Sequence, residues 1–496
     1  MGIIVKQSAK NLVTTYLGFG IGAVNTLFLY TNFLQPEYYG LVSFLLSAAG
    51  ILWPLLAFGV SNSLVKFYSS YADARQQDGL LNMALVLPLV VALVVGSFGI
   101  IFYQQILDYF AGGNELVQDY VWLIYVMALG SAYFEVFFSW AKVHYKSVFG
   151  NFMKEVFQRL AVSVLLMAVY FGWLTVEEFV YWLSGIYLLR AFIMKLYAFS
   201  LRLPRLSRLF PLNWIPVLKY SSLILIAGSV AMILLDLDKV MIEYYLPIEN
   251  VAIYSIAIYI ASVIGVPSKA MHQITYPLTA ILINEKDRPG LRDLYRKSSI
   301  SLLVISGLIF ILVISNLSGI YSLIPKQYEL PFVIVVLVAS VKLYDNLLGN
   351  NNSILFNSDY YRLVLWTGVM LAGAAFLFNI IFIPAFGLIG AALATFLAFF
   401  LYNTVKLFIV YQKFGIHPFS KKTLLGLICI AVFSAGFSFW DFRVHPFLNI
   451  ILKSLLIVVL YLPLIRFLNL SPDMNRLITQ SWEKISGQGG KDAGEN

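Results

Sequence analysis

Several ionisable side chains lie inside stretches of sequence that are otherwise almost entirely apolar. Arg190 follows the run SGIYLL, and Lys342 and Asp345 stand three positions apart after the run FVIVVLVASV. An ionised group in hydrocarbon costs about 2.5–3.5 kcal/mol, so such groups usually pair with one another or line a water-filled cavity. A guanidinium group can grip a phosphate through two parallel hydrogen bonds. The chemistry that these residues offer is the binding of an anion.

Two interpretations of Lys342 and Asp345 stay open. Residues three positions apart share one face of a helix, so the two side chains can neutralise each other between packed helices. Alternatively, both line a cavity, and Asn346 extends its polar surface. Arg190 is expected about 15 Å from the cytoplasmic end of its helix, which makes it the leading candidate for an anion ligand.

Three further charged residues are candidates for gating or for coupling to an ion gradient. Asp238 and Lys239 end a predicted helix on the outer side, and Asp238 is either a gating or cation-coupled group or a surface hinge contact. Glu135 lies about 9 Å inside its predicted helix. There it either binds a coupling proton or makes an interhelical hydrogen bond.

The composition of the chain indicates which elements position these residues. Of 496 residues, 60% are hydrophobic and 12% are charged, whereas soluble domains carry about twice that charged fraction. Apolar runs of about 20 residues are long enough to cross a bilayer, and backbone amides in lipid must be paired, so the runs predict helices. The predicted helices are 11–33, 40–62, 79–103, 116–141, 153–171, 177–200, 218–236, 250–272, 298–320, 331–349, 361–383, 387–412, 423–440 and 446–468. The fold class is therefore all-α, with about fourteen transmembrane helices.

The distribution of basic residues predicts the orientation. If Lys6 and Lys10 are cytoplasmic, every second connection between helices should be basic, and this alternation holds along the chain. Both termini are therefore expected inside. The net charge of +9 is explained by this topology, so the expected charged partners are anionic membrane lipids and not nucleic acid.

The chain also contains signs of two halves. The connection from Leu201 to Leu218 follows the sixth predicted helix. At a constant offset of 212, four residues correspond to four later ones: Leu34, Glu37, Gly40 and Ser43 to Leu246, Glu249, Ala252 and Ser255. Two six-helix lobes in a parallel pseudo-repeat are expected. The predicted parts are an N-terminal lobe at 1–205, a C-terminal lobe at 206–415, two further helices at 416–470 and a cytoplasmic tail at 471–496.

Three segments carry a resemblance to a known family. NFLQPEYYGL at 32–41 resembles the L-G-P-x-x-Y-G turn of bacterial polysaccharide exporters. Asp238-Lys239 followed by IYSIA at 253–257 resembles their D-x-x-x-x-x-x-x-G-x-Y-S-x-A stretch, with Ala252 in place of glycine. IPAFGLIGAALAT at 383–395 resembles their I-P-x-x-G-I-x-G-A-A-x-A-T segment. The chain thus resembles the Wzx-type oligosaccharide flippases of the superfamily that also holds multidrug extruders and lipid II flippases.

The resemblance implies a fold and a function. The expected fold is MATE-like, with two lobes around a central cavity. The expected function is alternating-access export of an undecaprenyl-diphosphate-linked repeat unit for O-antigen, capsule or exopolysaccharide across the bacterial cytoplasmic (inner) membrane. Arg190, aided by Lys342, is then expected to bind the diphosphate. No cofactor is expected, but proton or sodium coupling is, and the resemblance suggests a polysaccharide polymerase and glycosyltransferases as partners.

Four other lysines are assigned by the same reasoning. For Lys66, Lys269 and Lys406, near predicted cytoplasmic helix ends, one interpretation is that the long side chain reaches the lipid headgroups. The other is a ring at the cytoplasmic mouth that first meets the diphosphate. Lys453 lies in the last predicted helix and is not expected to face the main cavity; one interpretation is that it faces a groove for the lipid tail.

Three alternative functions fit the sequence less well. A multidrug antiporter usually has twelve helices and an acidic residue in its first span, where this chain has Asn25 and Asn32. A lipid II flippase is expected to carry arginines in its first two helices, which are absent here. An enzyme of the pathway is expected to have a large external loop, but every external connection is short, and Cys429, the only cysteine, forms no metal site.

Overall fold

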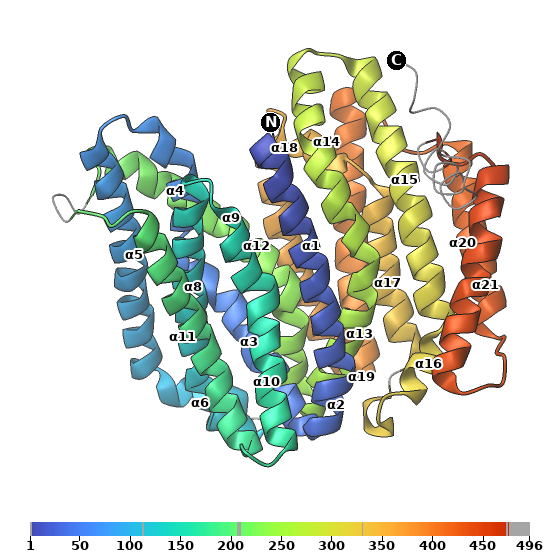
Figure 1. Cartoon of the computed structure of the whole chain (residues 1–496), viewed down its shortest axis with the longest axis horizontal. Coiled ribbons are helices and arrows are strands. Elements are labelled where there is room, and N and C mark those ends of the chain that lie inside the picture. The colour runs from blue at the N-terminus through green and yellow to red at the C-terminus, as the bar shows by residue number, and fades with distance from the viewer. Residues whose placement is uncertain (1, 112–113, 206–209, 330, 473–474, 476–496) are drawn as a thin grey trace, which may run out of the picture. The chain divides into compact units, whose positions relative to one another are not determined.

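The computed structural model describes residues 2–111, 114–205, 210–329, 331–472 and 475. All regular structure in this part of the chain is helical (Figure 1). The contacts between residues divide the chain into two compact units. Unit 1 comprises Met1–Ile256 and Ala372–Ala391, and unit 2 comprises Ala257–Leu371 and Ala392–Asn496.

Unit 1 contains most of the helices before residue 256. These are α1 (Gly2–Val24), α2 (Tyr30–Phe33), α3 (Pro36–Ala57), α4 (Val60–Phe67), α5 (Ala74–Ile101), α6 (Tyr103–Ala111), α7 (Glu115–Gln118), α8 (Val121–Val143), α9 (Ser147–Phe152), α10 (Gln158–Tyr170), α11 (Val176–Leu201) and α12 (Trp214–Tyr245). Two π-helical turns, η1 (Asn25–Leu29) and η3 (Met153–Phe157), and a 3-10 turn, η2 (Tyr68–Ser70), interrupt them. The first part of α13 (Glu249–Ser262) also belongs to unit 1.

Helix α8 is the centre of unit 1. It packs against α3 and α11, and the buried core beside it includes Phe134 and Trp140. The approach of α8 to α11 depends on Gly130, because a Cβ atom there would come within 3.0 Å of the Tyr187 main chain. A local sequence signal fixes the start of α11, since the Thr175 side chain accepts a hydrogen bond from the Glu178 N–H in a capping box.

Unit 2 contains the remaining helices. These are α14 (Val266–Asn284), α15 (Arg288–Ser315), α16 (Leu317–Ser322), α17 (Phe332–Leu347), α18 (Asn351–Phe356), both ends of α19 (Tyr361–Phe414), α20 (Lys421–Ser438) and α21 (Pro446–Phe467), with 3-10 turns η4 (Val263–Gly265) and η5 (Lys326–Tyr328). The middle of α19, residues 372–391, belongs to unit 1. Helix α15 packs against α14, α17 and α20. Its start is fixed by Asp287, whose side chain accepts a hydrogen bond from the Gly290 N–H.

The long helix α19 contains a break at Gly387. This residue has φ 58° and ψ −136°, a conformation that side chains with a Cβ rarely adopt. The two predicted helices at 361–383 and 387–412 correspond to the two sides of this break.

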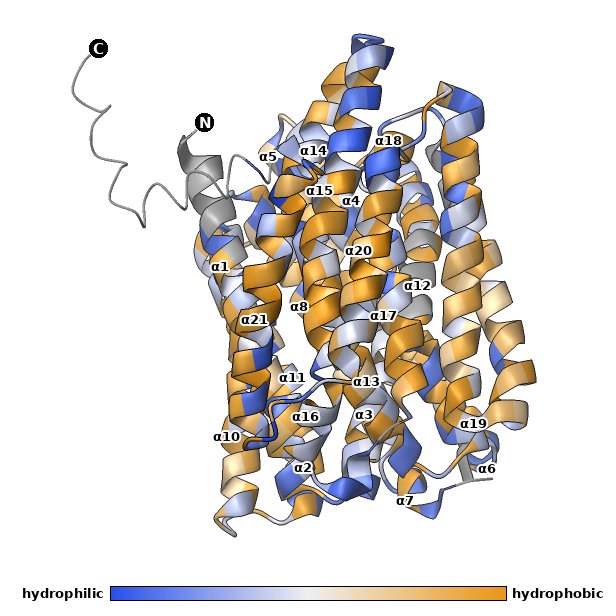
Figure 2. Ribbon diagram, turned by 90° about the vertical axis from the view of Figure 1, so that its right-hand side faces the viewer, coloured by the Kyte–Doolittle hydropathy of each residue, from blue (hydrophilic) through white to orange (hydrophobic). Residues whose placement is uncertain are grey.

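The sequence prediction of an all-helical membrane protein is confirmed. Each of the predicted helices overlaps a helix of the structure. In helices such as α15, α20 and α21, the middle part is mostly hydrophobic (Figure 2). Among the described residues, ten helices are long and apolar enough to cross a membrane. The number is lower than fourteen partly because α19 counts once, and because α10 and α17, with 13 and 16 residues, are short. The count of fourteen stays a prediction.

Other predictions on organisation also remain open. Residues 206–209 of the connection between the sixth and seventh predicted helices lie outside the described residues, and so do 473–474 and 476–496 of the predicted tail. The predicted lobe boundaries and the cytoplasmic position of both termini stay predictions.

Candidate functional site

Asp345 lies within a group of basic side chains in unit 2. Its charge acts on Lys342 from the same helix, on Lys406 from α19 and on His272 from α14. Lys269, in the first turn of α14, is also close enough to Lys342 for their positive charges to repel each other. Three helices thus bring three lysines, one histidine and one carboxylate together. The group carries an excess of positive charge beside apolar membrane helices, which suits an anionic ligand.

The lysines of this group are held mainly by uncharged partners. Lys406 is 2% exposed, donates a 2.9 Å hydrogen bond to the Asn352 Oδ1 atom and lies 4.1 Å from the centre of the Tyr402 ring. The Lys342 ammonium lies 5.7 Å from the centre of the Phe399 ring. Among the described residues, neither lysine has a carboxylate oxygen within 4 Å. Lys342 and Asp345 therefore do not form a close ion pair.

Asn346 has a different place from the one expected for it. Its side chain is 1% exposed, and its amide donates to the Ile264 carbonyl at 2.6 Å and to the Ser306 hydroxyl at 2.7 Å. These bonds join α17 to η4 and α15. In this structure Asn346 holds helices together and does not extend the polar surface of Lys342 and Asp345.

Arg190 lies in a second polar group, inside unit 1. Its guanidinium group donates to the Gln158 side chain and, at 3.5 Å, to the Ser131 hydroxyl, and it lies 4.2 Å from the centre of the Phe134 ring. The side chain is 6% exposed, and its Nε–H has no hydrogen-bond partner among the described residues. Because an unpaired buried donor is costly, this N–H group is available to an acceptor that enters the site.

Glu135 lies near Arg190 and is part of an ion pair. Its Oε1 atom is 2.5 Å from the Lys154 Nζ atom, which comes from η3, and Lys142 also acts on its charge. This ion pair corresponds to the second interpretation of Glu135, a polar contact between helices.

Asp238 is buried within unit 1 at the meeting point of three helices. It is 6% exposed, and its carboxylate accepts hydrogen bonds of 2.9 Å from the Tyr254 hydroxyl on α13 and from the Asn379 amide on α19. Among the described residues, the buried Asn379 Oδ1 atom has no hydrogen-bond partner. Lys239 pairs instead with Asp236, at 3.2 Å. Asp238 is therefore a buried interhelical group and not a surface contact.

Two other lysines, Lys66 and Lys453, make contacts within their own units. The Lys66 ammonium lies 3.8 Å from the centre of the Tyr220 ring in unit 1. Lys453 is fully buried and donates to the Ser315 carbonyl and to Asp441. The expectation that Lys453 faces a groove is therefore wrong, because its ammonium group is enclosed by these two partners.

Sequence reasoning missed some members of both groups. Gln158 and Tyr187 around Arg190, and Asn352 and Tyr402 around Lys406, were not singled out. The available signal was a polar side chain beside a buried charge, but its partner on another helix is known only after the helices are packed.

The fold is similar to two classes of solved membrane transporter. The lipid II flippase MurJ, in an inward closed conformation, matches with a TM-score of 0.67 at 14% identity, covering 92% of this chain and 98% of the flippase. An inward-facing multidrug resistance MATE family transporter of the MOP superfamily matches with a TM-score of 0.52 at 14% identity, covering 87% of this chain and 94% of the transporter. The chain thus has the fold of these solved flippases and transporters.

Sequence comparison identifies the family. Residues 4–282 match the family described as polysaccharide biosynthesis protein. The uncharacterized membrane protein MJ1068 of Methanocaldococcus jannaschii is 23% identical over 433 residues, which cover 82% of this chain and 83% of that protein. The chain belongs to the polysaccharide biosynthesis protein family and is a multi-pass membrane protein. The resemblance found in the three sequence segments is confirmed at this level.

Proposed function

We propose that the protein is a flippase that moves an undecaprenyl-diphosphate-linked oligosaccharide from the cytoplasmic to the outer leaflet by alternating access. The observation that carries the proposal is that Lys342, Lys406 and His272 lie near the carboxylate of Asp345, with Lys269 near Lys342. A diphosphate needs positive charge inside the membrane, whereas the prenyl tail can stay in lipid. Excess cations at such a place are costly unless an anion or water compensates them.

Arg190 supports the same proposal from unit 1. A guanidinium group has five N–H donors in a fixed fork, which fits phosphate oxygens. In this structure Gln158 and Ser131 accept from it, but its Nε–H has no partner in the part of the chain that the structure describes. Arg190 is therefore proposed as a second ligand of the diphosphate.

Asp238 is proposed as the site that couples transport to a proton or sodium gradient. Its buried carboxylate accepts a hydrogen bond from Asn379, whose Oδ1 atom has no partner among the described residues. Both side chains supply oxygen atoms, which a proton or a small cation can bind. The test is transport into vesicles with and without an imposed proton or sodium gradient. A rate that depends on neither gradient excludes this role.

The orientation and the partners follow from the same proposal. The alternation of basic connections supports cytoplasmic termini, in the bacterial inner membrane. Glycosyltransferases that supply the lipid-linked unit and a polysaccharide polymerase that consumes it are the proposed partners.

The test is made in cells that produce the glycan and lack their own copy of this gene. Surface glycan is measured after expression of the wild-type chain, of Lys342→Ala and of Lys413→Ala, an exposed lysine at the end of α19. The proposal expects export with the wild-type chain and the Lys413 variant, and strongly reduced export with the Lys342 variant at equal membrane levels. Equal export by both variants would exclude the basic group as the binding site.

Two alternative substrates are separated by the same cells. Rescue of a strain depleted of its lipid II flippase, without restored glycan export, would indicate lipid II. Raised resistance to cationic drugs, without restored glycan export, would indicate a multidrug antiporter.

A further inference from the structure

The first turns of α15 carry three arginines on one face. Arg288, Arg292 and Arg296 are each four residues apart, so they follow one side of the helix over about 12 Å. All three are exposed, and in the described residues none has a carboxylate oxygen within 4 Å. The nearest acidic residue of the helix, Asp293, pairs with Lys297 at 2.6 Å.

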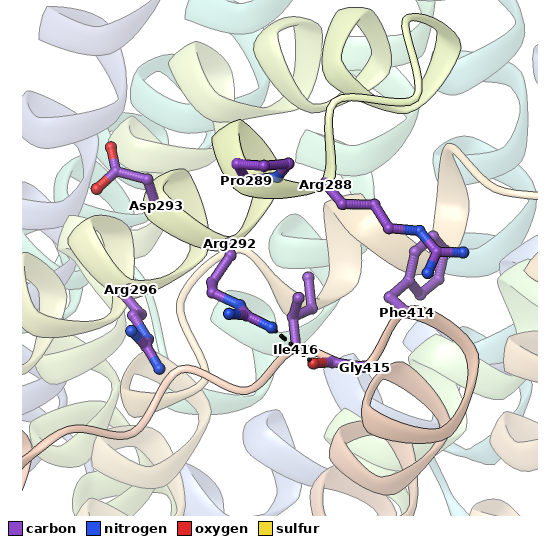
Figure 3. Close-up of a pocket in the computed structure, with 8 residues that line it drawn as sticks. All are labelled: Arg288, Pro289, Arg292, Asp293, Arg296, Phe414, Gly415 and Ile416. Carbon is purple, nitrogen blue, oxygen red and sulfur yellow. Dashed lines mark hydrogen bonds between the residues drawn. The ribbon is translucent and has the colours of Figure 1, made fainter.

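These arginines line a concave site within unit 2. The pocket has a volume of about 480 Å³, and its other walls are Pro289, Asp293 and the residues where α19 ends, Phe414, Gly415 and Ile416. The Arg292 side chain donates a 3.2 Å hydrogen bond to the Gly415 carbonyl, which fixes its direction across the pocket. Figure 3 shows the Asp293 carboxylate pointing away from the three guanidinium groups.

The position of the pocket along the helices indicates the level of the lipid headgroups. Every charged residue of α15 lies before Ser298, so Arg288, Arg292 and Arg296 precede the part that crosses the hydrocarbon. Phe414 and Ile416 give the pocket an apolar wall, and Ile416 is 2% exposed. A ligand that combines an anionic phosphodiester with apolar carbon fits both kinds of wall.

We propose that the pocket formed by Arg288, Arg292 and Arg296 with Phe414 and Ile416 binds the headgroup of an anionic phospholipid. Guanidinium groups bind the non-bridging phosphate oxygens in pairs. Basic pockets between membrane helices select anionic headgroups for this reason. The site is separate from the basic group around Asp345, and it gives the protein a specific contact with the lipid around it that is independent of the proposed substrate.

The proposal is tested with the purified full-length protein in a zwitterionic detergent. Binding of dioctanoyl phosphatidylglycerol is compared with that of dioctanoyl phosphatidylcholine and of inorganic phosphate. The wild-type chain is expected to bind the phosphatidylglycerol saturably and the other two much more weakly. Inorganic phosphate that competes at equal concentration would assign the pocket to a free anion and overturn the lipid proposal.

Two variants with the same loss of charge separate the pocket from the general positive surface. Replacing Arg288, Arg292 and Arg296 with glutamine should weaken phosphatidylglycerol binding at least about tenfold. Lys286 lies just before α15, Lys413 near the end of α19 and Lys421 at the start of α20, and none of them lines the pocket. Replacing these three lysines with glutamine should change the phosphatidylglycerol affinity less than about twofold. An equal loss in both variants would overturn the proposal, because diffuse charge would then explain the binding.

A second variant with fewer substitutions keeps the test valid if the triple variant misfolds. Arg288→Gln with Arg296→Gln changes two exposed side chains and leaves the hydrogen bond from Arg292 to Gly415 in place. Its melting temperature without lipid should equal that of the wild-type chain, while its phosphatidylglycerol affinity falls several-fold. Unchanged affinity in this double variant would overturn the proposal.

Discussion

The ammonium group of Lys453, on α21, donates a 2.6 Å hydrogen bond to the main-chain carbonyl of Ser315, the last residue of α15. The same group lies 3.1 Å from the carboxylate of Asp441, which belongs to the connection between α20 and α21. The last carbonyls of a helix have no partner within the helix and carry a partial negative charge, so a buried cation is stabilised there. Lys453 therefore fastens the last two helices to α15.

Replacing Lys453 with methionine should destabilise unit 2. The substitution keeps the length of the side chain but removes the donor, so the Ser315 carbonyl loses this partner in a buried place. The expected loss is about 1–3 kcal/mol, seen as a lower melting temperature in detergent. Lys421→Met, at an exposed position in the first turn of α20, is the control and should change little. Equal melting temperatures for the two variants would contradict this role of Lys453.

The pH dependence of stability should include a contribution from Asp441. The hydrogen bond from Asn449 and the charge of Lys453 lower the pKa of this carboxyl group below its ordinary value. A carboxyl group whose pKa is lower in the folded state stabilises the fold above its unfolded pKa of about 3.9. This stabilisation is lost as the pH falls through the folded pKa.

The corresponding test compares the wild-type chain with Asp441→Asn over a range of pH. The variant should melt below the wild-type chain at neutral pH, and the difference should shrink as the pH falls toward 3. Because Asp441 is about half exposed, the difference should be small and should decrease with added salt. A difference that stays constant over the whole range would assign it to the amide substitution alone.

Gly387→Ala should destabilise the break in α19. At φ 58° and ψ −136° an alanine Cβ is strained although no neighbouring atom blocks it, and such strain costs about 1–3 kcal/mol. Gly373→Ala is the matched control in the helical part of α19, where a Cβ also meets open space. That variant should be unchanged or slightly more stable, since alanine favours a helix by about 1 kcal/mol. Melting temperatures in the reverse order would show that the break is absent.

The sequence predicts the helices much better than it predicts the contacts between them. Apolar length and turn signals are local, and they place a break close to Gly387 because IPAFG interrupts a long apolar run. The small residues that permit close packing, such as Gly130 against Tyr187, are also visible, but their partner helix is not. The π-helical turns η1 and η3 have no signal in the apolar pattern, so the uninterrupted helices predicted there differ from the structure.

The candidate sites show the same limit. Lys342 and Asp345 are neighbours on one helix, so their association is local and was expected. Lys406 and His272 lie near Asp345 only because of the way α19 and α14 pack in unit 2. No short sequence pattern predicts this packing. Asn346 was assigned to the same surface by its position, but a residue one step along a helix points about 100° away. Its buried amide binds Ile264 and Ser306 accordingly.

Arg190 gives the sharpest test of the proposed binding site, because charge and hydrogen-bond geometry can be separated there. Arg190→Lys keeps a positive charge but lacks the fork that reaches Gln158 and Ser131 together, and Arg190→Ala lacks both. If the arginine binds the diphosphate through its fork, both variants should reduce glycan export at least about tenfold at equal membrane levels.

The control for this pair is Lys195→Ala, an exposed residue further along α11 whose loss should leave export unchanged. Export that is lost with alanine but kept with lysine would mean that Arg190 acts only as a charge. Export that is kept in both variants would remove Arg190 from the site and leave the group around Asp345 as the only proposed ligand. A fall in membrane level that matches the fall in export would instead assign Arg190 to the packing of α8 against α11, where Phe134 and Tyr187 enclose it.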